Sequence, residues 1–167
     1  LDGGTGDDQM YGGTDNDTYY IDSSSDLVVE NVGEGIDTVR VSVGGYMLGD
    51  NVERAIISGY ALTVYGNSLG NMLVGQSLNG SQIYGGAGND TINSGGLGNS
   101  MYGGAGNDTY HLSNEFNYVV ENSDEGIDTV FVAYNGHQLG NNVENGRLLS
   151  GGGWVLFGNS LDNSLVC

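Results

Sequence analysis

The sequence has no proline, no lysine and very little positive charge of any kind. Its only basic residues besides histidine are Arg40, Arg54 and Arg147, against 21 acidic residues, so the 167-residue chain has a formal net charge of −18. Such a charge repels nucleic-acid phosphates and anionic lipids, so we expect neither nucleic-acid binding nor membrane insertion. It also opposes compaction, which predicts that the folded chain binds something that neutralises it.

Cysteine and histidine are scarce as well. The single cysteine, Cys167, excludes a disulfide framework and a zinc site of the Cys-x-x-Cys type, and the two histidines have no partner at zinc-ligand spacing. No apolar run approaches the ~18 residues of a membrane-spanning helix. No acid–base pair or nucleophile stands out either. We therefore expect that this chain is not an enzyme and that any catalytic activity would lie in flanking domains.

Glycine is abundant instead, with 32 residues, and it recurs at a fixed period. The clearest copies are "GGTGDDQMY" (3–11), "GGTDNDTYY" (12–20), "GGAGNDTIN" (85–93) and "GGAGNDTYH" (103–111). An apolar residue ends an Asp-x-apolar triplet, or a degraded form of it, about every nine residues. A period of nine does not suit a helix, where each glycine would cost roughly 1 kcal/mol. Short apolar segments between Gly-rich turns are typical of short strands.

A longer repeat is superimposed on the nonapeptides. The segment "VVENVGEGIDTV" (28–39) matches "VVENSDEGIDTV" (119–130) at ten of twelve positions, about 91 residues further on. We therefore predict one continuous module over residues 1–167, made of two copies at about 1–75 and 76–167, with loop insertions at 32–35 and 123–126. Because the chain begins with Leu1 rather than Met, we expect it to be a fragment of a longer protein.

Two nonapeptides make a circuit of 18 residues, so each is expected to stack on the second one after it, in parallel sheets around a thin core. The turn residues then alternate between two edges. We count the Asp-x-apolar triplets along the chain, take the last residue of each as inward, Val52 and Val143 included, and place alternate triplets on alternate edges. This count places on one edge Asp8, Asp26, Asp50, Asn71, Asp90, Asp108 and Asp128. The same count assigns the other edge Asp17, Asp37, Leu62, Ser81, Asn99 and Asn117. The second edge loses its carboxylates, so we expect it to close by hydrogen bonding alone.

The four nonapeptides resemble the Gly-Gly-x-Gly-x-Asp repeat of the repeats-in-toxin (RTX, haemolysin-type) family, and 17–39 looks like the longer coil that often follows it. The resemblance implies an all-β fold, a right-handed parallel β-roll with Ca²⁺ between stacked turns. It also implies a bacterial protein exported by type I secretion, and therefore extracellular or at the cell surface. The partners it implies are calcium ions and flanking domains of the parent protein. The alternative is a module that binds polysaccharide or a cell surface, as part of an extracellular carbohydrate-active enzyme or adhesin.

Calcium takes six to eight oxygen ligands, and a tight Gly-rich turn can supply backbone carbonyls while its final Asp supplies a carboxylate. In turn 12–17, Asp15 replaces the third glycine, and Asp is one of the few side chains that visit the left-handed region. The expected carboxylate ligands are Asp8, Asp17, Asp22, Asp26, Asp37, Asp90, Asp108 and Asp128. The expected carbonyl ligands lie in turns 85–90 and 103–108 and include Gly86, Gly88, Gly103 and Ala105.

The candidate sites lie between neighbouring turns of one edge: Asp8 with Asp26, Asp17 with Asp37, Asp90 with Asp108, and Asp108 with Asp128. About four calcium ions would reduce the charge of −18 to about −10. Glu30 and Glu121, just before the two insertions, either assist a site or are solvated strand ends, and we favour the second interpretation. The eleven tyrosines either bind sugars or pack on the sheets, and packing is the commoner use of aromatic residues in strands.

Overall fold

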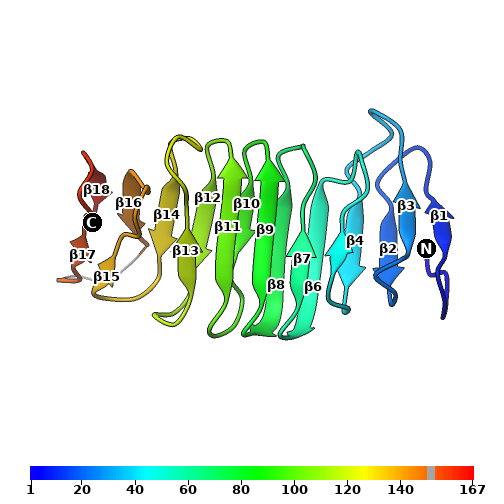
Figure 1. Cartoon of the computed structure of the whole chain (residues 1–167), viewed down its shortest axis with the longest axis horizontal. Helices are drawn as coiled ribbons and strands as arrows, with labels where there is room; N and C mark the ends of the chain where they lie inside the picture. Colours follow the sequence, from blue (N-terminus) through cyan, green and yellow to red (C-terminus); the bar gives the residue numbers. More distant parts are fainter. Residues whose placement is uncertain (150–152) are drawn as a thin grey trace.

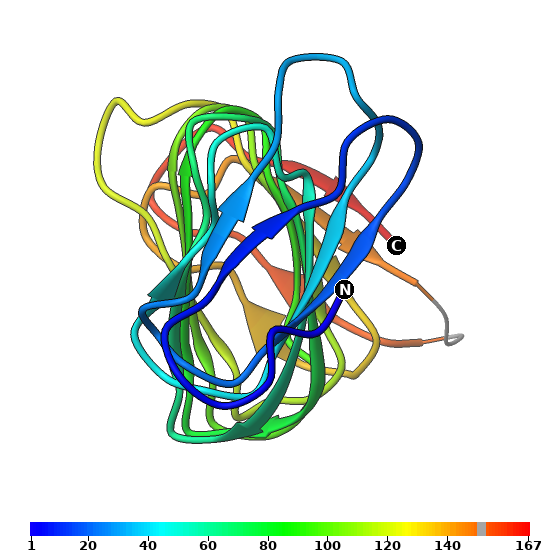
Figure 2. The ribbon, with the colours of Figure 1, turned by 90° about the vertical axis from the view of Figure 1, so that its right-hand side faces the viewer.

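The computed structural model describes residues 1–149 and 153–167, and within them all regular structure is β-strand. The chain winds as a parallel β-solenoid of about nine turns, whose strands stack along one long axis (Figure 1). Viewed along that axis, the turns overlap as a flattened coil with strands on its two faces (Figure 2). The predicted class, an all-β parallel solenoid of stacked nonapeptides, is confirmed. In the described part of the chain no helix could cross a membrane.

One face is a single parallel sheet that follows the solenoid along its length. Among the described residues it contains nine strands: β2 (Thr18–Ile21), β4 (Thr38–Val41), β6 (Arg54–Tyr60), β8 (Met72–Asn79), β10 (Thr91–Asn93), β12 (Thr109–Leu112), β14 (Thr129–Val132), β16 (Asn145–Leu148) and β18 (Ser164–Val166).

The opposite face is divided into shorter parallel sheets. Its described strands are β1 (Gln9–Tyr11) with β3 (Leu27–Val29), then β5 (Tyr46–Met47), β7 (Thr63–Tyr65), β9 (Gln82–Ala87), β11 (Ser100–Ala105) and β13 (Tyr118–Val120), then β15 (His137–Gln138) with β17 (Leu156–Phe157). The breaks follow β3 and β13, so they fall at equivalent places in the two copies of the long repeat.

The register confirms that each nonapeptide stacks on the second one after it. Ile92 pairs with Tyr110 on one face, and Ile83 pairs with Met101 on the other. All four of these side chains are 0% exposed, because alternation along each short strand points them between the two faces. The predicted apolar ladder therefore forms the core.

The predicted assignment of turns to the two edges is wrong for the first half of the chain. Between Val39 and Val64 the chain forms two strands, β5 and β6, where the triplet count places one around Val52. Val52 is buried, but it lies in the turn between these strands, and the inward residues are Tyr46 and Ala55. The count missed them because Gly44 and Glu53 stand two positions before them, while Asp50-Asn51-Val52 between them matches the triplet pattern. The same error recurs at Val143, which lies between β15 and β16.

The corrected register gives the two edges different compositions. The turns that lead from an odd- to an even-numbered strand lie along the top of Figure 1, and we call them the acidic edge. The acidic edge carries Asp17, Asp37, Glu53, Asn71, Asp90, Asp108, Asp128 and Glu144. The turns from even- to odd-numbered strands form the amide edge, with Asp8, Asp26, Leu62, Ser81, Asn99 and Asn117. At the residue that ends each turn, carboxylates are thus retained along most of the acidic edge, whereas the amide edge has Leu62, Ser81, Asn99 and Asn117 there after Asp26.

Truncating a core residue should destabilise the solenoid strongly. Ile83→Ala removes a side chain that is 0% exposed, and we expect it to lower the free energy of unfolding by about 2–5 kcal/mol. Met47→Ala, at a strand residue that is 64% exposed, is the matched control and should change it by less than about 0.5 kcal/mol. Urea denaturation in saturating calcium measures both; equal midpoints for the two variants would contradict the assignment of the core.

Candidate metal centres

A ladder of hydrogen bonds joins successive turns of the acidic edge. The backbone N–H of Asp90 donates to Oδ1 of Asp108 over 2.7 Å, and the N–H of Asp108 donates to Oδ1 of Asp128 over 2.8 Å. Asp17 and Asp37 are joined in the same way, over 2.8 Å. Each such bond fixes a carboxylate between two turns and uses only one of its two oxygens.

The second oxygen of these carboxylates is the feature that indicates a metal. Oδ2 of Asp90 and Oδ2 of Asp108 are buried and have no hydrogen-bond partner in the described structure. An isolated carboxylate oxygen buried without a donor or a cation is strongly unfavourable. A calcium ion takes oxygen ligands of this kind. The residues therefore fit a calcium ion between turns 85–90 and 103–108.

Gly85 shows where that ion would lie. A Cβ atom at Gly85 would collide with Oδ2 of Asp90 and would lie 2.7 Å from the carbonyl oxygen of Gly103. The missing side chain thus leaves a small space on which a carboxylate oxygen and a carbonyl oxygen of neighbouring turns converge. Gly103, one of the predicted carbonyl ligands, is placed for this role.

The other predicted carbonyl ligands point along the stack. The carbonyl oxygens of Gly86 and Gly88 lie so close to Gly104 and Gly106 that a Cβ at either glycine would collide with them. Ala105 accepts a hydrogen bond from the N–H of Gly88 over 2.8 Å. These carbonyls therefore help to stack the turns, and their role as calcium ligands stays a prediction.

The amide edge forms the same ladder without charge. The N–H of Ser81 donates to Oδ1 of Asn99 over 2.9 Å, and the N–H of Asn99 donates to Oδ1 of Asn117 over 3.0 Å. On this edge the side-chain amide nitrogen, rather than an ion, interacts with carbonyl oxygens of the turn. Nδ2 of Asn99 donates to the carbonyl of Ser94 over 2.9 Å, and Nδ2 of Asn117 donates to that of Gly96 over 2.9 Å. These turns thus form the hydrogen bonds that were expected to close this edge.

Asp8 and Asp26 form a separate pair at the start of the amide edge. The N–H of Asp8 donates to Oδ1 of Asp26 over 3.1 Å, as predicted for stacked turns. Oδ2 of Asp26, however, already accepts from the N–H groups of Asp22 and Ser23, both over 3.2 Å. The Asp22 side chain is exposed. Asp8 Oδ2 is buried and unpartnered, so this pair keeps one free ligand oxygen where Asp90 and Asp108 have two.

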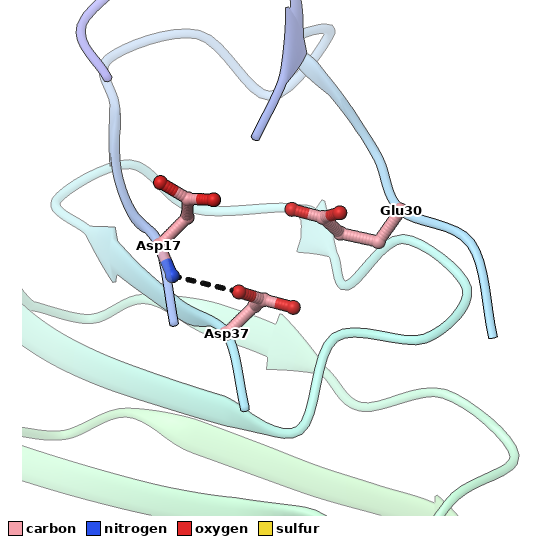
Figure 3. A group of neighbouring side chains, drawn as sticks. All are labelled: Asp17, Glu30 and Asp37. Atoms are coloured by element: carbon pink, nitrogen blue, oxygen red, sulfur yellow. Dashed lines mark hydrogen bonds between the residues drawn. The ribbon is translucent and has the colours of Figure 1, made fainter. Parts of the chain in front are cut away.

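Two groups on the acidic edge contain a third carboxylate. Asp17, Glu30 and Asp37 form one, with ligand oxygens within 4.8 Å of one another, and Asp108, Glu121 and Asp128 form the other. Figure 3 shows the carboxylates of the first group facing a common space. The two groups lie at equivalent positions of the two long repeats.

The favoured interpretation of Glu30 and Glu121 as solvated strand ends is therefore wrong. Their exposed fractions are 5% and 6%, and their side chains accept hydrogen bonds from the buried phenols of Tyr19 and Tyr110. The repetition of "VVEN" before each insertion was the available signal. It was not decisive, because a Glu at a strand end is usually exposed.

Burial raises the pKa of several of these carboxyl groups. It raises the pKa of Asp90 to about 7 and that of Asp128 to about 6, in each case against a lowering by a backbone hydrogen bond. It raises the pKa of Glu121 to about 8, despite the hydrogen bond from Tyr110, and nearby Asp128 adds to the increase. Without a cation, burial thus favours the protonated forms of Asp90 and Glu121 near neutral pH.

The metal-free fold should therefore be favoured by mild acid. A carboxyl group whose pKa is raised on folding stabilises the fold below its unfolded pKa, and this contribution is lost as pH rises through the folded pKa. From the values for Asp128, Asp90 and Glu121, we expect the metal-free β signal in circular dichroism to fall between about pH 6 and 8. Calcium affinity should rise over the same range. A metal-free signal that grows as pH increases would show that these groups are not buried together.

Asp108 lies between two turns with carboxylates, so its loss should affect two sites. We expect Asp108→Asn to lower the calcium stoichiometry in calorimetric titration, because Asn retains Oδ1 for the ladder but replaces the free Oδ2 by an amide. Asn99→Ala is the control from the amide edge. It should cost about 1–3 kcal/mol of stability through lost buried hydrogen bonds and leave the stoichiometry unchanged. If Asn99→Ala lost ions and Asp108→Asn kept them all, the roles of the two edges would be reversed.

Comparison with known protein families agrees with this geometry. Residues 1–28 and 81–101 match, as four copies, the family described as RTX calcium-binding nonapeptide repeat. The matched segments include Asp8, Asp17, Asp26 and Asp90, while the similar segment 103–111 lies beyond them. No curated protein and no solved structure matches the chain.

Proposed function

Because the chain belongs to the RTX calcium-binding nonapeptide repeat family, we propose that it is a module that folds when it binds calcium outside the bacterial cell. In this proposal the chain leaves the cell unfolded by type I secretion, then folds and stabilises or presents the domains attached to it. The occurrence of RTX repeats in secreted bacterial proteins supports the location. The observation that carries the proposal is the set of buried, unpartnered carboxylate oxygens along the acidic edge.

Calcium would act here as a counter-ion and cross-link rather than as a catalyst. When bound, it neutralises carboxylates of successive turns that burial and mutual repulsion otherwise destabilise. Asp90, Asp108 and the carbonyl of Gly103 would hold one ion, and the two three-carboxylate groups would hold others. These oxygens come together only when the turns stack, so the binding free energy becomes folding free energy. We propose no catalytic role for the chain.

The charge of the chain supports a switch between two states. At −18, the metal-free chain repels itself and should be expanded, which suits passage through an exporter. Extracellular calcium-binding modules typically have dissociation constants of about 10⁻⁴–10⁻³ M, so they stay empty at low calcium and fill outside the cell.

Polysaccharide binding is the alternative function. The observation that favours it is a shallow groove beside Tyr84 and Tyr102 that also includes Asn122 and Glu125, because sugars combine with aromatic and polar groups of this kind. Tyr65, Tyr84 and Tyr102, however, stack on one another, with ring centroids 5.0 and 4.4 Å apart, so their faces already serve packing. Binding to acidic or cell-wall polysaccharide in saturating calcium, lost in Tyr102→Ala, would support this alternative.

Calcium should be required for a folded β-solenoid at neutral pH. We expect circular dichroism of the metal-free chain at about pH 8 to show little regular structure and a few millimolar calcium to restore the β signal. Magnesium should substitute poorly, because it requires near-octahedral geometry and loses its waters reluctantly. A well-formed β spectrum in chelator, unchanged by calcium, would refute the proposed function.

A further inference from the structure

We call the site between Asp90 and Asp108 the regular site. The two three-carboxylate groups differ from it in the identity of the oxygen atoms that lie beside the first glycine of the turn. At Gly85, the space of the missing side chain is bounded by Oδ2 of Asp90 and the main-chain carbonyl of Gly103. At Gly12, the corresponding space is bounded by the hydroxyl of Tyr19, Oδ2 of Asp17 and Oε1 of Glu30, and at Gly103 it is bounded by Oδ2 of Asp108 and the hydroxyl of Tyr110. In both groups, side-chain oxygens thus border the glycine where the regular site has a main-chain carbonyl oxygen of the next turn.

The register explains this difference. Tyr11 pairs with Val29 and Tyr102 with Val120, so the next residues place Glu30 beside Gly12 and Glu121 beside Gly103. In both long repeats, Glu therefore occupies the position of the first glycine of a regular turn. Its main-chain carbonyl is occupied elsewhere, because it accepts from Nδ2 of an Asn on the following turn, Asn51 or Asn142, over 2.9 Å in each copy.

A tyrosine holds each of these Glu side chains in place. Tyr19 donates to Oε1 of Glu30, and Tyr110 donates to Oε1 of Glu121. The other oxygen, Oε2, is buried and unpartnered in both residues. The phenol oxygens also border the glycine spaces, since a Cβ at Gly12 or Gly103 would collide with them. Each group thus offers an oriented, unpartnered carboxylate oxygen that is more than nine-tenths buried.

The turns that carry these Glu residues are held independently of any ion. Glu34 accepts from the backbone and side-chain nitrogens of Asn31, both over 2.9 Å, and Glu125 accepts from those of Asn122 over 2.8 and 2.9 Å. These bonds close the longer loop on its outer side. Glu30 and Glu121 are therefore not needed to close these loops, and Oε2 of each has no hydrogen-bond partner.

We propose that Glu30 and Glu121 are direct calcium ligands that create two high-affinity sites, one per long repeat, which fill before the two-carboxylate site of Asp90 and Asp108. This inference rests on the calcium-binding function proposed above and extends it. Each group has three carboxylates, whereas the regular site has Asp90 and the Asp108 that it shares with Glu121 and Asp128. Ligand charge and rigidity are what set the affinity of calcium sites. Tyr19 and Tyr110 supply the rigidity.

Calorimetric titration of substitution variants tests the ligand role. In Glu30→Gln/Glu121→Gln we expect the two tightest calcium ions to bind at least ~10-fold more weakly. Each single variant should lose one tight ion and keep the other. Asp90→Asn, the same chemical change at the regular site, should keep both tight ions. Glu115→Gln, an exposed residue of the amide edge, controls for the loss of one charge and should resemble the wild type.

Terbium luminescence gives a second readout that does not depend on the folding of the Gln variants. Terbium replaces calcium in oxygen sites and emits when a nearby tyrosine transfers energy to it. With the single tryptophan replaced in Trp154→Phe, we expect the first two equivalents of terbium to give most of the tyrosine-sensitised emission. Additional Tyr19→Phe and Tyr110→Phe substitutions should remove most of it.

The outcomes separate this inference from the proposed function. If the double Gln variant binds calcium like the wild type while Asp108→Asn loses ions, calcium binding stands and the role of Glu30 and Glu121 is refuted. Emission that appears only after later equivalents, or that survives both Phe substitutions, refutes it as well. If the wild type shows neither heat on titration with calcium nor tyrosine-sensitised emission on titration with terbium, the proposed function itself fails.

Discussion

The structure depends on one hydrogen bond repeated from turn to turn, from a backbone N–H to the side-chain oxygen of the residue that ends the next turn. On the acidic edge this bond positions Asp90, Asp108 and Asp128 one above another over 2.7–2.8 Å. It also leaves the second oxygen of Asp90 and of Asp108 in the interior with no donor. The parallel sheets, the thin core and the close stacking of the glycines all hold the turns at the spacing that this bond requires.

The amide edge shows that the ladder itself does not need charge. Asn117 accepts from the backbone of Asn99 just as Asp108 accepts from that of Asp90. The difference lies in the second atom, where an NH₂ group donates to turn carbonyls and satisfies the site from within. Replacing Asp by Asn therefore changes a turn with an unpartnered carboxylate oxygen into a turn whose side-chain amide is hydrogen-bonded within the fold. The degraded repeats of this chain are structural rather than defective.

The nine-residue repeat of the sequence predicted the stacking of the turns and the core. Two repeats make one turn of the solenoid, so an apolar residue that recurs every nine residues points inward each time. The pattern also predicted the pairs Asp17–Asp37, Asp90–Asp108 and Asp108–Asp128, since each pair depends only on neighbouring repeats. The pattern did not identify Tyr46 and Ala55 as inward residues, because the residue that ends the turn two positions earlier is Gly or Glu rather than Asp or Asn. Glu53 reaches the N–H of Asp37 over 2.8 Å with its longer side chain, and a pattern built on Asp does not detect it. The burial of Glu30 depends on Tyr19 from an earlier turn, which sequence spacing alone does not reveal.

Asn71 interrupts the carboxylates of the acidic edge between Glu53 and Asp90, and its Nδ2 donates to the carbonyl of Val52 over 3.1 Å. Successive turns of a parallel sheet are about 4.8 Å apart, so divalent cations in adjacent sites repel one another along the axis. A long unbroken column would accumulate this repulsion with every ion added. In the calcium-bound state proposed above, a neutral turn at Asn71 would divide the column into two short series, one in each long repeat, and would limit how far one bound cation disfavours the next.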